Sequence, residues 1–180
     1  MKPILTHRTL ALWVSVPLVI SALSGILYRV GRAWFDMPKD SWGWLMDLHT
    51  GAWLGRWGSV IYLSFAAIGL LVMAGTGATM LLKRGSKRPS RRRHRLLGMT
   101  LLLPLVATAI TGISYKIGVE FFGLNDSMQD LLMDIHQGSW MGRAATPFYV
   151  LLVGSGLLIV ILSGLRIGPW WRKKNHSAVG

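Results

Sequence analysis

Four long stretches without a charged residue constrain the fold of this 180-residue chain more than any other feature of its sequence. They are Thr9–Tyr28, Trp57–Leu82, Leu96–Tyr115 and Ala144–Leu165. An α-helix rises about 1.5 Å per residue, so about 20 residues cross the hydrocarbon core of a bilayer. A backbone in lipid must satisfy its own hydrogen bonds, which favours helices. The sequence therefore predicts an all-α membrane protein with four transmembrane helices.

The second half of the sequence repeats the first half at an offset of 87 residues. The phrase LMDLHTGAWLGRW, which begins at Leu45, returns as LMDIHQGSWMGRA from Leu132. Each copy contains two predicted spans, so both copies enter the membrane from the same side and are related by an axis along the membrane normal. We therefore expect two parallel-repeat helical hairpins, residues 1–82 and 94–168, with a basic cytoplasmic connector at 83–93 and a cytoplasmic tail at 169–180.

The basic residues indicate how the chain is oriented. The formal net charge is +13, and eight basic residues lie between Lys83 and Arg95. The loops on the opposite face, residues 29–56 and 116–143, hold all seven acidic residues and six basic ones. Positively charged loops stay in the cytoplasm, so both termini are expected there. The excess of positive charge favours a topology signal or contact with anionic lipid, and no nucleic-acid partner is expected.

The outer loops contain short helical patterns of their own. The segments DSWGWLMDLH and NDSMQDLLMDIH are predicted to form short amphipathic helices at the membrane interface, where tryptophan is common. Ser127 with Asp130 resembles a capping box at the start of the second helix. Gly51 and Gly138 are expected to end the two helices just after their histidines.

Four of the five histidines form two repeat-related pairs. His7 corresponds to His94, and His49 corresponds to His136, while His176 lies in the polar tail and is expected to be solvated. A span separates His7 from His49 by about the 30 Å thickness of the hydrocarbon core, so these two cannot share one metal. The economical pairing is His7 with His94 on the cytoplasmic side and His49 with His136 on the outer side.

Paired imidazoles without cysteine favour a b-type haem over other metal centres. The absence of cysteine excludes iron–sulfur clusters, thiolate ligands and covalently attached c-type haem. Two histidines are too few for a structural zinc site, which has four ligands. Two axial imidazoles do complete the coordination of iron in a porphyrin. We therefore expect two haem b groups per chain, with His7, His94, His49 and His136 as the iron ligands.

The surroundings of these histidines suit a porphyrin. Gly25 and Gly112 lie on the same helix faces as His7 and His94, where they leave room for a large planar ligand. Cations for the propionates are expected from Arg8, Arg95, Arg56 and Arg143. Plainer roles also fit, because small residues suit helix packing and a histidine at a membrane edge is commonly an interfacial side chain.

Two pairs of segments resemble the transmembrane region of the PepSY-associated family. They are HRTLALWVSVPLVISALSGILYR with HRLLGMTLLLPLVATAITGISYK, and LHTGAWLGRWGSVIYLSFAAIGLLVMAGTG with IHQGSWMGRAATPFYVLLVGSGLLIVILSGLRI. The resemblance covers nearly the whole chain. It implies a di-haem electron carrier of the bacterial cytoplasmic membrane, with His7, His49, His94 and His136 as haem ligands. Relatives include inner-membrane reductases that release iron from siderophores.

The chain departs from the larger relatives in one respect. Those carry extracytoplasmic PepSY domains in the outer loops, and some carry a cytoplasmic flavin module, whereas the outer loops here have fewer than 30 residues each. This minimal form leaves the electron donor open, which is a quinone or a cytoplasmic reductase. The outer acceptor is also open, and it is a ferric chelate, a siderophore or a redox partner. Oxidoreductase activity and assembly into a homo-oligomer or a larger complex are open as well.

Two other functions stay open. The chain fits a haem-free scaffold subunit of a transporter or respiratory complex, in which the histidines only pack or contact lipid. A small iron or siderophore permease is less favoured, because the predicted spans carry no charged residue in their interiors and solute pathways usually need some.

Overall fold

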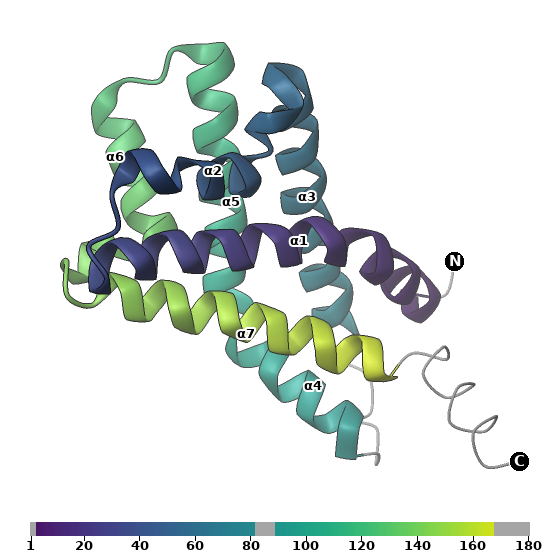
Figure 1. The fold of residues 1–180 in the computed structure, drawn as a ribbon. Helices are drawn as coiled ribbons and strands as arrows, with labels where there is room; N and C mark the ends of the chain where they lie inside the picture. The colour runs from purple at the N-terminus through teal and green to yellow at the C-terminus, as the bar shows by residue number, and fades with distance from the viewer. Residues whose placement is uncertain (1–2, 82–88, 168–180) are drawn as a thin grey trace, which may run out of the picture.

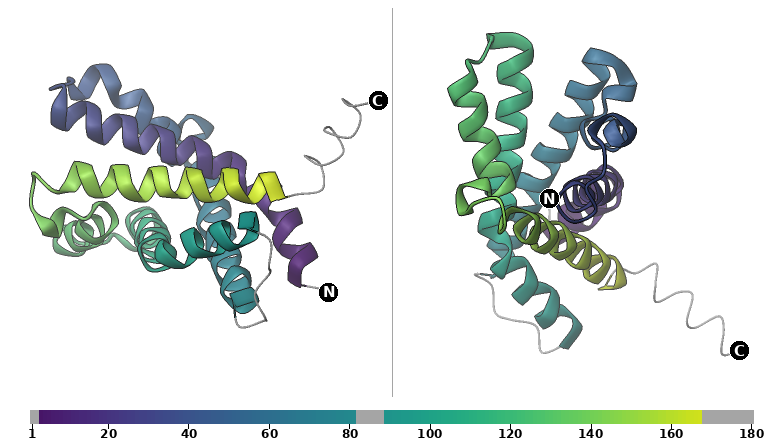
Figure 2. Two further views of the ribbon diagram at one scale, coloured as in Figure 1. Left: turned by 90° about the horizontal axis from the view of Figure 1, so that it is seen from below. Right: turned by 60° about the vertical axis from the view of Figure 1, so that its left-hand side comes forward.

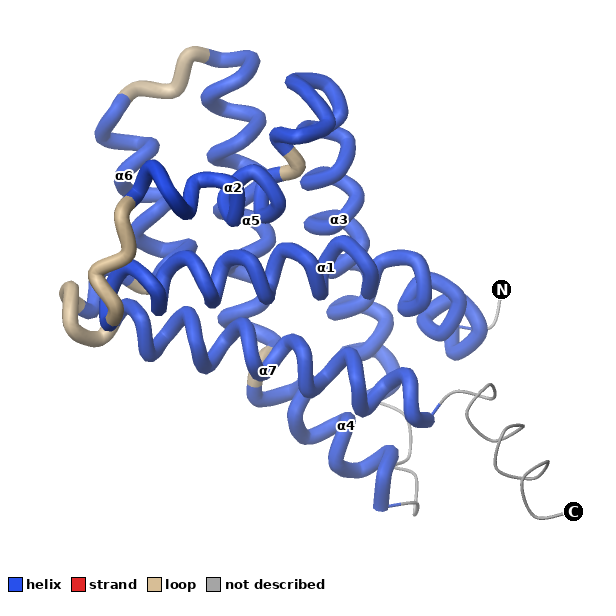
Figure 3. Tube along the Cα trace, in the orientation of Figure 1, coloured by secondary structure: helices blue, strands red, loops and turns tan. Residues whose placement is uncertain are grey.

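The computed structural model describes residues 3–81 and 89–167, which form helices joined by short loops (Figure 3). These described residues contain no strand. In chain order the elements are α1 (Pro3–Trp34), α2 (Lys39–Thr50), η1 (Ala52–Leu54), α3 (Gly55–Leu81), α4 (Pro89–Thr100), α5 (Leu102–Phe122), α6 (Asp126–Gln137), η2 (Ser139–Met141) and α7 (Thr146–Ile167). The predicted all-α class is confirmed.

Four of the helical segments are long and apolar enough to cross a membrane. They are His7–Trp34, Ala52–Met80, Leu102–Phe122 and Thr146–Ile167. Large apolar side chains point outward along them, such as Trp13, which is 71% exposed, and Leu103, which is 79% exposed. An apolar surface of this extent suits lipid rather than water. The chain is therefore a multi-pass membrane protein, and the predicted number of four spans is confirmed.

The spans pack as two pairs that cross one another. α1 and α7 lie side by side in Figure 1, and α3 and α5 run across them. Figure 2 shows the same crossing from two other sides. Each pair combines one helix from each half of the chain, so the two halves pack extensively against each other. The predicted division into two separate hairpins stays a prediction.

The centre of the fold is built twice from repeat-related residues. Gly69 in α3 lets α1 approach so closely that a Cβ there would lie 2.6 Å from Val14. A Cβ on Gly156 in α7 would likewise lie 2.6 Å from the Leu101 side chain. The buried core around these contacts consists of Val14, Leu18, Ala66, Leu70, Leu101, Leu105, Ala109, Val153 and Leu157. The sequence repeat is therefore also a repeat of packing contacts.

The two halves differ where the second copy divides its first helix. α1 runs unbroken through Pro17, whereas the equivalent stretch is split at Leu101 into α4 and α5, just before Pro104. Proline lacks an N–H, and its ring clashes with the carbonyl four residues back, which favours a break there. The expectation of one continuous helix over residues 96–115 is therefore wrong. α4 also takes in residues 89–93 of the predicted connector, whose remainder lies outside the described residues, as does the predicted tail.

The short helices predicted in the outer loops are present as α2 and α6. Each ends, as predicted, at a glycine in the left-handed conformation, Gly51 with φ 72° and Gly138 with φ 70°. The start of α6 differs from the prediction. Its N-cap is Asn125 rather than Ser127, because the Asn125 side chain accepts the backbone N–H of Met128 at 3.0 Å.

Candidate functional site

His49 and His136 come together where the two halves of the chain meet. They lie in the last turns of α2 and α6, respectively. Their ring centroids are 6.2 Å apart, and the ring planes are inclined by 77°. We call these two residues the outer pair, and His7 and His94 the inner pair. The fold thus brings together the two outer histidines that the repeat pairs in the sequence.

Both rings of the outer pair donate the Nδ1 proton to a backbone carbonyl in their own half of the chain. His49 Nδ1 lies 2.8 Å from the Ser21 carbonyl oxygen in α1, and His136 Nδ1 lies 3.0 Å from the Thr108 carbonyl oxygen in α5. A carbonyl oxygen only accepts, so both rings carry their proton on Nδ1. Nε2 of each ring is then unprotonated and able to bind a metal.

Gly25 and Gly112 make room for these two imidazoles. A Cβ on Gly25 would lie 3.0 Å from His49 Cε1, and one on Gly112 would lie 2.8 Å from His136 Cε1. The sequence predicted room for a porphyrin at both glycines, on the helix faces that carry His7 and His94. In the structure they lie against the outer pair instead, because α2 and α6 fold back onto α1 and α5.

The outer and inner pairs lie toward opposite ends of α1. His49 packs on α1 at Gly25, which follows His7 by 18 residues in the same helix. That length of α-helix rises about 27 Å, close to the thickness of the hydrocarbon core. Each pair therefore forms a site of its own.

The inner pair bonds to side-chain hydroxyls, and His94 also has the backbone carbonyl of Val160 as an acceptor. His7 Nδ1 lies 2.8 Å from Thr76 Oγ1 in α3, and His94 Nδ1 lies 2.8 Å from Ser163 Oγ in α7. Each hydroxyl also lies 2.8 Å from a backbone carbonyl oxygen of its own helix. Both contacts are hydrogen bonds when the hydroxyl donates to the carbonyl and accepts from the imidazole. This arrangement puts the proton of His7 and that of His94 on Nδ1 and leaves Nε2 unprotonated.

Both inner histidines line one cavity of about 880 Å³. Its walls are mostly apolar and come from α1, α3, α4, α5 and α7. Four arginines add positive charge to the lining, namely Arg8, Arg91, Arg92 and Arg95. Cofactor sites are typically apolar clefts of about 300–1,000 Å³ with a few polar groups. The structure therefore places the predicted cations Arg8 and Arg95 in a cavity of cofactor size beside the inner histidines.

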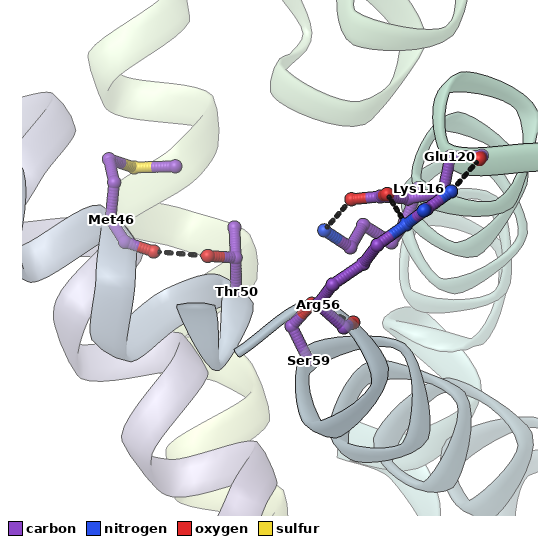
Figure 4. A network of polar contacts seen from close by, with 6 residues as sticks. All are labelled: Met46, Thr50, Arg56, Ser59, Lys116 and Glu120. Carbon is purple, nitrogen blue, oxygen red and sulfur yellow. Dashed lines mark hydrogen bonds and ion pairs between the residues drawn. The ribbon is translucent and has the colours of Figure 1, made fainter. Parts of the chain in front are cut away.

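The two outer arginines lie in different surroundings. Arg56 Nε donates to Glu120 Oε2 at 2.9 Å, and a second guanidinium nitrogen donates to the Glu120 carbonyl oxygen at 2.8 Å (Figure 4). Lys116 donates to the same carboxylate at 2.7 Å. Arg143 is exposed. Arg56 therefore already has an anionic partner, and it joins α3 to α5.

Burial keeps the histidines outside the spans neutral. Desolvation lowers the pKa of His136 from 6.5 to about 4, and the neighbouring His49 lowers it further by a smaller amount. Desolvation also lowers the pKa of His49 and that of His94 below the usual value. Metal ligation requires neutral imidazole, so these three side chains are in the ligand form at neutral pH.

The groups that hold the histidines were not among the predicted site residues. They are Ser21 and Thr108 for the outer pair, and Thr76 and Ser163 for the inner pair. A signal was present in the sequence, because the offset of 87 residues relates Ser21 to Thr108 and Thr76 to Ser163. Ser and Thr side chains in membrane helices can form hydrogen bonds to a neighbouring helix, and their recurrence at equivalent positions was the available signal.

One family model, described as the PepSY-associated TM region, matches residues 30–124. The match covers more than half of the chain and includes His49 and His94. Neither a curated protein nor a solved structure matches the chain. The chain therefore belongs to the PepSY-associated transmembrane family.

Proposed function

We propose that this chain is a di-haem b-type cytochrome that carries electrons across the bacterial cytoplasmic membrane, with both termini in the cytoplasm. His49 and His136 would hold the outer haem, and His7 and His94 the inner one. One observation carries the proposal: each of the four imidazoles binds a partner in its own half of the chain through Nδ1 and keeps Nε2 for a ligand.

The spacing of the outer pair supports a single metal between the two rings. A bond from an imidazole nitrogen to a metal ion such as zinc is about 2.0–2.1 Å long. Two such bonds in line, with about 1.1 Å from each ring centre to its nitrogen, separate the ring centroids by about 6 Å. The observed separation of 6.2 Å matches this value.

The number of ligands favours haem over a bare ion. No group of three or more His, Cys, Asp or Glu side chains placed to hold a metal ion occurs within residues 3–81 and 89–167. Two imidazoles are too few for a tetrahedral zinc site. They are the number that iron already held by a porphyrin requires.

The inner cavity supports the second haem. Its volume of about 880 Å³ and its mostly apolar walls suit a porphyrin, and Arg8 and Arg95 offer charge for propionate carboxylates. Among the outer cations, Arg56 is already bound to Glu120. We therefore assign propionate binding to Arg8 and Arg95 first.

A bound haem would accept and release one electron at a time, and the residues of the chain would fix where this happens. The neutral imidazoles ligate, the apolar spans exclude water, and the two pairs stand about 27 Å apart along α1. The donor would be a quinone or a cytoplasmic reductase. The acceptor would be a ferric chelate, a siderophore complex or a redox partner outside the cytoplasm.

Liposomes that contain the pre-reduced full-length protein test electron transfer to the outside. An external ferric chelate that cannot cross the membrane should oxidise the wild-type protein. His49→Ala should slow this oxidation severely, whereas His176→Ala, which changes the histidine of the tail, should not. Oxidation of the His49→Ala protein at the wild-type rate would contradict electron exit through the outer pair and would favour the scaffold function.

A further inference from the structure

We infer that Thr76 and Ser163 are positioning residues that hold His7 and His94 in the Nδ1–H tautomer and thereby set how strongly their Nε2 atoms donate to a metal centre. The two hydroxyls occupy repeat-equivalent positions on α3 and α7. Each lies 2.8 Å from the Nδ1 atom of an inner histidine. The same contact is therefore made twice, by residues of different type.

The direction of each hydrogen bond follows from where the hydroxyl proton goes. Thr76 Oγ1 donates to the Val72 carbonyl at 2.8 Å, and Ser163 Oγ donates to the Val160 carbonyl at 2.8 Å. A hydroxyl has one proton and two lone pairs, so the imidazole must be the donor in the second bond. Donation to a carbonyl also polarises the hydroxyl oxygen and makes it a better acceptor.

Ordinary back-bonding does not account for this arrangement. Serine and threonine in membrane helices often bond to a carbonyl of the preceding turn and do nothing else. Thr79, on the same helix as Thr76, shows this behaviour, with Oγ1 donating to the Thr76 carbonyl at 2.9 Å. Thr76 and Ser163 differ from Thr79 because the hydroxyl oxygen of each also accepts a hydrogen bond from an imidazole.

A comparison with the outer pair shows what loss of the Thr76 or Ser163 hydroxyl should change. His49 and His136 donate to backbone carbonyls, which no side-chain substitution removes. Partners of this kind fix the tautomer of a metal-bound histidine and raise its basicity, and their loss typically costs about 10–100-fold in metal affinity. The inner site should therefore respond to substitutions at Thr76 and Ser163, most strongly at Thr76, because the Val160 carbonyl remains an acceptor for His94. The outer site should not respond. This consequence for haem rests on the proposed function, whereas the tautomers do not.

Thr76→Val and Ser163→Ala remove the hydroxyls with little change of shape. In the haem-free full-length protein in nanodiscs, nitrogen NMR of labelled histidine should show the Nδ1–H form for His7 and His94. Thr76→Val should lose it at His7, and Ser163→Ala should reduce it less at His94, where the Val160 carbonyl remains an acceptor. In the haem-loaded protein, the midpoint potential of the inner haem should shift upward, because a less basic ligand stabilises ferric iron less. The outer haem should be unchanged. Inner-haem affinity should fall about 10–100-fold.

The repeat supplies the rescue variants, and α3 supplies the control. Thr76→Ser and Ser163→Thr keep a hydroxyl and should behave as the wild type, as should Thr79→Val. Unchanged tautomers and an unchanged inner potential in Thr76→Val and Ser163→Ala would overturn the inference. A wild-type protein that binds no haem would overturn the proposed function instead. The histidine tautomers measured by NMR in the haem-free protein would still test the inference.

Discussion

The imidazole of His136 lies so close to α5 that Gly112 has no space for a side chain. A Cβ on Gly112 would lie 2.8 Å from His136 Cε1. We predict that Gly112→Ala displaces the ring, lowers haem occupancy of the outer pair and destabilises the fold by about 1–3 kcal/mol, as overpacking does. Haem content and thermal unfolding of the purified protein measure both effects.

Gly75 offers a matched control for this substitution in another span. A Cβ on Gly75 would meet nothing within 4 Å. Alanine is the better helix former, so Gly75→Ala should be neutral or stabilising by about 0.5–1 kcal/mol. Equal haem content and equal stability of the two variants would show that Gly112 is not needed to make room for His136.

Burial of His136 makes stability depend on pH. Its pKa falls from the ordinary 6.5 to about 4 on folding, so between these values the unfolded chain binds a proton that the native chain does not. The stability that the neutral ring contributes is therefore complete above about pH 6.5 and is lost as the pH falls toward 4. We predict that the Tm of the haem-free protein drops across this window and that His136→Asn flattens the drop. A wild-type Tm that stays constant there would speak against the burial of a neutral ring.

At the scale of the helices, Arg56, Glu120 and Lys116 connect the outer ends of α3 and α5 (Figure 4). The Arg56 side chain is 58% exposed, so salt screens its interaction with Glu120. We predict that Arg56→Gln lowers the Tm at low ionic strength and has little effect at high ionic strength. Thermal unfolding at two salt concentrations measures this difference.

Arg143 is the natural control because it is the repeat equivalent of Arg56. It is exposed, and the position equivalent to Glu120 in the first half is Ala33, which cannot form an ion pair. Arg143→Gln should therefore leave the Tm unchanged at both salt concentrations. An equal decrease of the Tm in Arg56→Gln and Arg143→Gln would mean that the ion pair between Arg56 and Glu120 does not stabilise the contact between α3 and α5.

The helices themselves could be predicted because their signals are local. Uncharged stretches mark the spans, and Gly51 and Gly138 mark the ends of α2 and α6 through residues that lie near in sequence. The division at Leu101 could not be predicted in this way. Pro17 and Pro104 occupy equivalent positions, yet only the second copy breaks, so the surrounding packing rather than the proline alone decides the outcome.

The candidate site was predictable only in part for a related reason. The repeat alone pairs His49 with His136, since one two-fold axis relates two equivalent ligands. The contact of Gly25 with His49 and that of Arg56 with Glu120 depend on how the short helices fold back and how each span is rotated. Hydrophobic periodicity specifies neither, so these partners emerged only from the structure.

At the scale of the whole molecule, the basic residues predict which face lies inside the cell. Lys39 belongs to a loop that is predicted to lie outside, and Ser86 belongs to the basic segment between the second and third spans. We predict that a membrane-impermeant thiol reagent added outside intact cells labels Lys39→Cys and not Ser86→Cys. The chain has no natural cysteine, so the background is free of competing thiols. Labelling of Ser86→Cys would reverse the orientation and exchange the outer and inner pairs.

The proposed function assigns one haem to each pair of histidines. The haem-to-protein ratio of the purified full-length chain, measured together with its reduced-minus-oxidised spectrum, tests this most directly. The account predicts a b-type spectrum with two haems per chain, and one haem after His49→Ala or after His94→Ala. A wild-type protein without haem, or one that holds a single haem which His49→Ala and His94→Ala both abolish, would contradict it.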